Sequence, residues 1–169
     1  VNMLTSTITD ELRISSNMKS KTIGIALKDR SAILPAGHAA TAAYWYDGST
    51  GCFISSTYYM TELPKWVQEF NKKELPKKYL NQPWNTLLPI EQYTESLPDD
   101  NKYETLFKGE TKSVFPHDLP KLVAANGGFG LIRNVPAGNT FTKDFAIETI
   151  KAENLGKSGV TDFLAISFS

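Results

Sequence analysis

The chain has 169 residues, of which 41% are hydrophobic and 21% charged, as in an ordinary globular domain with a substantial core. Its 18 basic residues balance its 18 acidic residues, which argues against nucleic acid or an anionic membrane as the main partner. No apolar run is long enough for a membrane span. Cys52 is the only cysteine, so an internal disulfide is excluded, and we expect its side chain to pack as a small hydrophobe.

The first predicted elements are a helix over about 7–15 and a strand over 22–27. Thr7 and Asp10 have the spacing of a capping box, which marks the start of a helix. The strand is apolar, small and rich in β-branched residues. This pattern is typical of a strand buried on both faces of an α/β sheet.

Lys28 and Arg30 follow this strand directly, and side chains alternate along a strand, so both are predicted on one side with Asp29 on the other. Ligands collect at the carboxyl ends of strands in open α/β sheets, and an ammonium beside a guanidinium suits phosphate or sulfate. Ordinary solvent-facing charges at a strand end explain the pair somewhat better on these residues alone. The next stretch, 31–38, is predicted as an apolar loop that lies against protein and shelters the two cations.

The middle of the chain is predicted to hold a β-hairpin over 42–60, with a turn at Asp47-Gly48-Ser49-Thr50-Gly51. A helix follows, with Pro64 in its first turn and an apolar stripe that runs to Phe70. The segment 74–121 holds most of the prolines and has no sustained period, which predicts an insertion over the sheet.

The last third is predicted as a loop at 127–130, a helix over about 140–155 capped by Asn139, and a strand over 163–169. The final strand has the apolar pattern of a central strand, which needs neighbours on both edges. We therefore expect the chain to be an internal piece of a larger protein, here called the parent.

Other candidate sites are weaker. His38 and His117 are the only histidines and lie far apart in sequence, whereas a two-zinc site takes about six clustered ligands. We predict that His38 is a satisfied loop residue and that His117 lies in a surface turn. Glycine-rich 127–130 lacks the pattern of a nucleotide-binding loop. Ser55 and Ser56 have no histidine close in sequence, which argues against a serine hydrolase. The hairpin aromatics are more typical of packing than of substrate stacking: Tyr44, Trp45, Tyr46, Phe53, Tyr58 and Tyr59.

The chain resembles one family along nearly its whole length. The resemblance is to the bacterial phosphate-irrepressible, zinc-dependent phosphomonoesterase branch of the alkaline phosphatase superfamily. The Lys-x-Arg pair marks monoesterases within a superfamily that also contains diesterases and sulfatases. The matching runs are 19–30, with Lys28 and Arg30, then 33–38, 43–46, 54–60, 63–67 and 161–169.

This resemblance implies an α/β segment of an alkaline-phosphatase-like sandwich, with a central, mostly parallel sheet, the hairpin 42–60 and the proline-rich insertion 74–121. It implies that Lys28 and Arg30 bind the non-bridging oxygens of a phosphate monoester in the transition state. The family uses two zinc ions and a threonine nucleophile, and none of their motifs matches within this chain. We therefore expect a catalytically inert chain that works with the remainder of the parent domain, which the family places in the periplasm or outside the cell.

Two other functions stay open at this point. A phosphodiesterase or sulfatase relative would act on monoanionic substrates. A pair of cations is less necessary for these than for a dianionic monoester. A non-catalytic binding module would use the hairpin and the insertion to recognise a glycan or a protein. The sequences that flank this segment in the parent discriminate between an enzyme and a binding module.

Overall fold

The fold of residues 3–168 is described by a computed structural model; Val1, Asn2 and Ser169 lie outside the described residues, so the predicted last strand is described only to Phe168. No helix in this part of the chain is long and apolar enough to cross a membrane. The elements in chain order are α1 (Ile8–Ser15), β1 (Thr22–Ala26), α2 (Asp29–Ala36), β2 (Ala42–Asp47), β3 (Cys52–Ile54), α3 (Lys65–Asn71), α4 (Leu75–Leu80), η1 (Ile90–Gln92), α5 (Leu119–Leu122), η2 (Gly128–Asn134), α6 (Ala137–Ala152) and β4 (Phe163–Ser167).

The centre of the fold is a four-stranded sheet in the order β3-β2-β1-β4. Strand β1 pairs in parallel with both β2 and β4, and β2 pairs with β3 in an antiparallel hairpin. The predicted α/β class with a mostly parallel sheet is therefore confirmed. The edge of β4 away from β1 has no partner strand among residues 3–168, so the predicted central strand is an edge strand of the described sheet.

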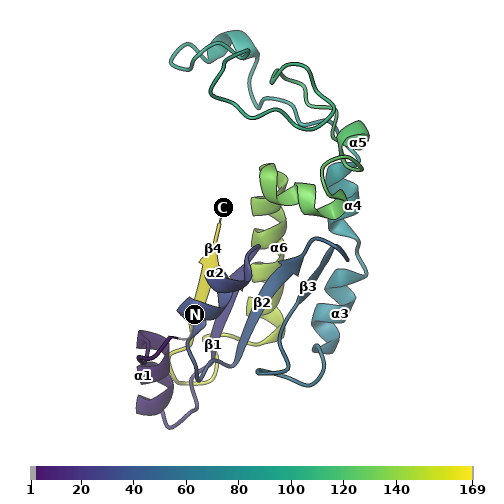
Figure 1. The fold of residues 1–169 in the computed structure, drawn as a ribbon. Coiled ribbons are helices and arrows are strands. Elements are labelled where there is room, and N and C mark those ends of the chain that lie inside the picture. The colour runs from purple at the N-terminus through teal and green to yellow at the C-terminus, as the bar shows by residue number, and fades with distance from the viewer. Residues whose placement is uncertain (1–2, 169) are drawn as a thin grey trace.

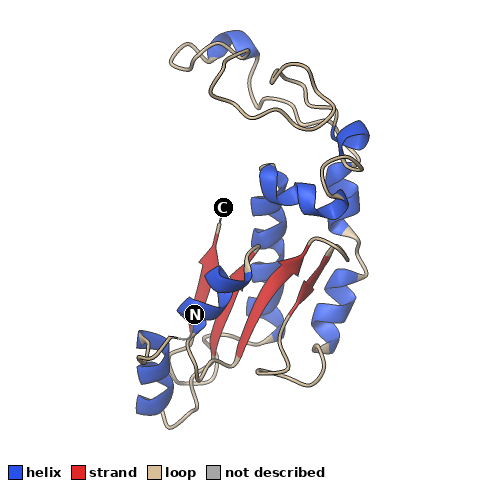
Figure 2. Cartoon of the chain, viewed as in Figure 1, coloured by secondary structure: helices blue, strands red, loops and turns tan. Residues whose placement is uncertain are grey.

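The two faces of the sheet are covered by different helices, as Figures 1 and 2 show. Side chains alternate along β1, so Ile23 and Ile25 join the large core with α6. Gly24 and Ala26 alternate with them, and Ala26 packs with Ala32 and Ala36 of α2 in a second, smaller cluster. Small residues on this face allow α2 to pack close to the sheet.

Aromatic side chains fill the core between the sheet and α6. The rings of Phe53 and Phe145 stack with centroids 3.9 Å apart, and Tyr44 meets Phe145 edge to face at 5.4 Å. Tyr46 contacts Phe141 in the same way at 5.5 Å. Three of the six hairpin aromatics are thus fully buried and pack, as predicted: Tyr44, Tyr46 and Phe53. Tyr58 instead is 68% exposed, and Trp45 and Tyr59 are half-buried.

The hairpin ends earlier than its predicted range of 42–60, because β3 stops at Ile54. Asn71 of α3 takes the place of a further strand. Its side-chain oxygen accepts from the Phe53 N–H, and its amide donates to the Phe53 carbonyl, both at 2.9 Å. Cys52 lies at the start of this short strand and is half-buried.

The segment 74–121 does not lie over a face of the sheet as expected. After α4 it extends beyond the carboxyl ends of the parallel strands and returns through α5 (Figure 1). Most of it is loop (Figure 2). Its aromatic side chains explain this position, because Trp84 packs against Phe115 and His117 of the same segment, with ring centroids 5.1 and 5.0 Å away. The segment thus has its own small core.

The start of the last helix and the glycine-rich stretch differ from their predictions. Helix α6 starts at Ala137 after Pro136, so Asn139 lies in the first turn and is not the cap. Proline suits this place because its fixed φ is already helical. The predicted loop 127–130 instead leads into the 3-10 helix η2, because Leu131 and Ile132 bury their side chains in the core.

Candidate functional site

Lys28 and Arg30 lie where β1 gives way to α2. The strand ends at Ala26, Lys28 is the extended residue before the helix, and Arg30 is already in the first helical turn. The carbonyl of Lys28 accepts the first helical hydrogen bond from the Ala32 N–H at 3.3 Å. Strand alternation therefore cannot direct both cations to one side, because it stops before Arg30.

The apolar loop predicted over 31–38 is also wrong, since most of it forms α2. The physical reason is a spacing of four: Ala32 and Ala36 fall on one helical face, where both are completely buried against the sheet. The helix turns back along the sheet and does not cover its own beginning. Lys28, Asp29 and Arg30 are accordingly exposed, not sheltered as expected.

The two cations have no charged partner within the described part of the chain. None of its ion pairs or side-chain hydrogen bonds involves Lys28, Asp29 or Arg30. The first N–H groups of α2 add partial positive charge at the same place, because they have no carbonyl partner inside the helix. Both features favour an anion from outside residues 3–168.

The sheet register brings other chain segments to this edge. Ala26 lies opposite Ser167 of β4 on one side and opposite Trp45 of β2 on the other. Three parallel strands therefore end at the edge that Lys28 and Arg30 follow. This is the edge at which open α/β sheets bind ligands.

Two other charged residues near the end of β2 have internal partners. Hydrogen bonds from the hydroxyls of Thr50 and Ser49 lower the pKa of Asp47 to about 2. Arg133 donates to the Tyr46 carbonyl at 2.6 Å and lies over the Tyr46 ring, 5.4 Å from its centroid. Asp47 and Arg133 thus stabilise the turn and its contact with η2.

Gly24 sets how close α2 lies to the strand before the two cations. A Cβ atom at Gly24 would overlap the backbone carbonyl oxygen of Ala32 and would lie 3.0 Å from the Cβ of Ala36. A glycine is therefore required for this packing distance. The position of the α2 start, and with it Arg30, depends on a residue that carries no chemistry.

The structure confirms the prediction for His38 but not the prediction for His117. His38 is a satisfied loop residue, as predicted: its Nδ1 lies 3.2 Å from Oδ2 of Asp10, and its Nε2 lies 2.9 Å from the Met3 carbonyl. His117 is not in a surface turn. It is only 4% exposed, because it packs among aromatic rings and lies 2.8 Å from Glu110.

The described residues do not fit a metal site. Between residues 3 and 168 no three His, Cys, Asp or Glu side chains group closely enough to hold an ion. The two zinc ions implied by the resemblance therefore cannot be assigned to side chains of residues 3–168.

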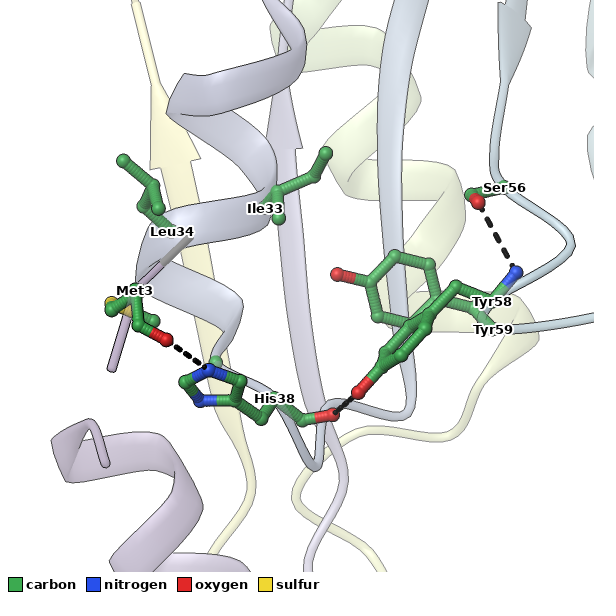
Figure 3. Close-up of a pocket in the computed structure, with 8 residues that line it drawn as sticks. Met3, Ile33, Leu34, His38, Ser56, Tyr58 and Tyr59 are labelled. Atoms are coloured by element: carbon green, nitrogen blue, oxygen red, sulfur yellow. Dashed lines mark hydrogen bonds between the residues drawn. The ribbon is translucent and has the colours of Figure 1, made fainter. Parts of the chain in front are cut away.

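A pocket lies at the other end of α2 and is drawn in Figure 3. It is a cavity of about 380 Å³. Its polar groups bond to one another, since the Tyr58 hydroxyl donates to the His38 carbonyl at 2.9 Å and the Tyr58 N–H donates to Ser56 at 3.1 Å (Figure 3). Ile33 and Leu34 add apolar surface, and His38, the residue of this lining that can be cationic, is paired with Asp10.

No protein-family model matches the chain, but individual relatives match over 99% of it. It is 54% identical over 168 residues to alkaline phosphatase PhoV of Synechococcus elongatus and 46% identical over 169 residues to alkaline phosphatase PafA of Elizabethkingia meningoseptica. It is also 56% identical over 170 residues to a protein of Myroides odoratus named calcium-transporting ATPase. The chain spans about 30% of the length of each of these relatives.

The fold matches a solved structure equally well. The crystal structure of wild-type PafA at 1.7 Å superposes with a TM-score of 0.89 over 95% of this chain and 31% of PafA, at 48% sequence identity. A PafA variant matches with the same TM-score. That variant carries four substitutions, of a threonine, an asparagine, and a lysine and an arginine that stand two positions apart.

Proposed function

Because this chain is homologous to a segment of alkaline phosphatase-type proteins, we propose that it is the part of a phosphomonoesterase that binds the phosphoryl group through Lys28 and Arg30. The observation that carries the proposal is the pair itself: two exposed cations without a partner among residues 3–168, at the carboxyl edge of a parallel sheet and at a helix start. The substituted lysine and arginine of the PafA variant have the same spacing, which supports this assignment.

In the proposed mechanism the guanidinium of Arg30 and the ammonium of Lys28 donate hydrogen bonds to non-bridging phosphoryl oxygens. Charge-assisted bonds of this kind are strong, and they act most where negative charge builds up in the transition state. A monoester carries two negative charges and a diester one, so two cations favour the monoester. The chain's contribution is binding and orientation of the phosphoryl group.

The remaining chemistry is proposed to reside in the rest of the parent. In the PafA variant, the substituted threonine and asparagine precede the substituted lysine by more residues than this chain has before Lys28. We propose that the parent supplies the nucleophile and two zinc ions, that residues 1–169 alone are inert, and that the parent works in the periplasm or outside the cell.

The Myroides relative suggests a second candidate, an ATP-hydrolysing protein, because its printed name is calcium-transporting ATPase. Both candidates transfer a phosphoryl group and would use two cations in the same way. Purified parent that hydrolyses ATP but no simple monoester would favour this second candidate.

The test is kinetic and uses the intact parent with Arg30→Ala and Lys28→Ala. Removal of one preorganised donor of this type typically lowers the rate on the order of 10²–10³-fold. We expect a loss of this size for a phosphate monoester and a much smaller loss for a diester. Asp29→Ala is the matched control, since it changes a neighbouring exposed charge that does not bind phosphate. Equal losses for the two ester classes would refute the assignment.

A further inference from the structure

Leu27 stands between the end of β1 and Lys28, and its side chain is only 1% exposed. The pairing of β1 with its neighbours ends at Ala26, whereas Lys28 is already exposed. Because side chains alternate along a strand, Leu27 continues the face of Ile25 and joins the large core. The chain therefore passes from the core to the proposed phosphate site within a single peptide bond.

The side chain of Leu27 packs against the first turn of α6. A Cβ atom at Gly138, the second residue of α6, would lie 2.9 Å from Cδ1 of Leu27 and would overlap the carbonyl oxygen of Ile132. Gly138 therefore leaves the space that Leu27 occupies. Helix α6 begins at the end of the sheet where the parallel strands end, as Figure 1 shows, so this contact lies directly below the proposed site.

The backbone of Lys28 is held from both sides. On the carbonyl side, the hydrogen bond from the Ala32 N–H ties Lys28 to α2. On the amide side, the next residue is the buried Leu27. The Lys28 ammonium forms no ion pair among residues 3–168. Since its stem is long and flexible, the position of the backbone sets the space that the ammonium can reach.

We propose that Leu27 is a positioning residue, whose packing against Gly138 holds Lys28 where its ammonium meets the phosphoryl group. Arg30 depends on Leu27 less, because Arg30 lies within α2 and the close packing of α2 on Gly24 sets its position. The two cations are thus held by different contacts, one on each face of the sheet. The proposal rests on the proposed phosphatase function and adds a residue that touches no substrate.

The test is a double-mutant cycle in the intact parent, measured as kcat/KM for a phosphate monoester. Misplacement of a binding group by about 1 Å can cost about 100-fold, so Leu27→Ala should lower kcat/KM roughly 10- to 100-fold. In a Lys28→Ala background the same change should cost less than about threefold, because the group that it displaces is already absent. In an Arg30→Ala background the loss should remain about 10-fold or more.

Leu80→Ala is the matched control. Leu80 of α4 is 2% exposed in the same core and loses the same atoms, but it does not adjoin a cation. At a temperature at which every variant is folded, Leu80→Ala should leave kcat/KM unchanged. Leu27→Met keeps the side-chain volume and should restore most of the activity. If Leu27→Ala does not fold, Leu27→Val, which removes less of the side chain, replaces it in the cycle.

Three results would overturn the proposal: unchanged kcat/KM in Leu27→Ala, equal losses in the Lys28→Ala and Arg30→Ala backgrounds, or an equally large loss from Leu80→Ala. Each of them leaves the proposed function intact, provided that Lys28→Ala by itself lowers monoester hydrolysis. If Lys28→Ala has no effect, the phosphate-binding function is refuted. The proposal for Leu27 then fails with it, because there is no phosphate-binding group to position.

Discussion

Substitution of Gly24 by alanine should separate α2 from the sheet. The added Cβ would overlap the Ala32 carbonyl oxygen, which is backbone and cannot rotate away, and it would press on Ala36 from 3.0 Å. Overpacking of a core typically costs 1–3 kcal/mol, and a clash with backbone belongs at the upper end, about 3 kcal/mol. The relatives are about three times as long as this chain, and the Tm shift is the free-energy change divided by the unfolding entropy, so in a parent of that size this corresponds to a Tm lowered by roughly 2–3 °C.

Thermal unfolding of the parent, followed by circular dichroism, measures this effect. Gly130→Ala is the matched control, since a Cβ there meets no atom within 4 Å and the backbone is not left-handed. It should leave the Tm unchanged or raise it slightly, because alanine reduces the entropy of the unfolded chain. Gly24→Ala should also lower monoester turnover, as Arg30 moves with the start of α2. If the Tm of Gly24→Ala stays within about 1 °C of wild type, the claim that the close packing of α2 on the sheet requires glycine at this position is refuted.

The remaining predictions concern two partly buried contacts. Burial alone would raise the pKa of Asp10, but hydrogen bonds from Ala39, Thr7 and His38 lower it to about 2, and the bond to Asp10 raises the pKa of His38. The hydrogen bond between His38 and Asp10 therefore stabilises the fold fully below pH 6.5, and this stabilisation is lost as the pH rises through the raised pKa of His38 in the folded protein. The Tm difference between wild type and His38→Gln should accordingly shrink from pH 5.5 to 8.5. A constant difference would contradict this. The Asp10 contribution is present above pH 3.8 and lost as the pH falls towards 2. Asn71→Ala removes both side-chain bonds to the Phe53 backbone and should cost about 1–3 kcal/mol in urea unfolding, whereas a loss below 0.5 kcal/mol would show that water replaces them.

Local sequence signals predicted the elements that local chemistry determines. The capping box of Thr7 and Asp10 is present with both of its reciprocal hydrogen bonds. The buried strand is described as Thr22–Ala26, and the turn after β2 joins an antiparallel pair. Each of these rests on contacts within a few residues, which a sequence pattern contains.

Predictions failed where distant contacts decide the structure. Pro35 and Gly37 suggested a loop after Arg30, but the burial of Ala32 and Ala36 against β1 stabilises a helix that ends just there. A small residue at every fourth position, opposite a strand glycine, was the available signal for this helix.

His117 was misread because Pro116 beside it suggested a turn. Its burial depends on Trp84, 33 positions earlier, whose ring and backbone both contact it. The aromatic residues interspersed among the prolines of 74–121 were a signal of a small separate core, and they could have predicted the burial of His117.

The most direct test of the central role of Lys28 and Arg30 is the inhibition constant of inorganic phosphate for the intact parent. Each charge-assisted hydrogen bond contributes about 1.5–3 kcal/mol, so Lys28→Ala and Arg30→Ala should each raise this constant roughly 10- to 150-fold at low ionic strength. Asp29→Ala should not raise it. Phosphate that inhibits both cation variants as tightly as wild type would contradict the account.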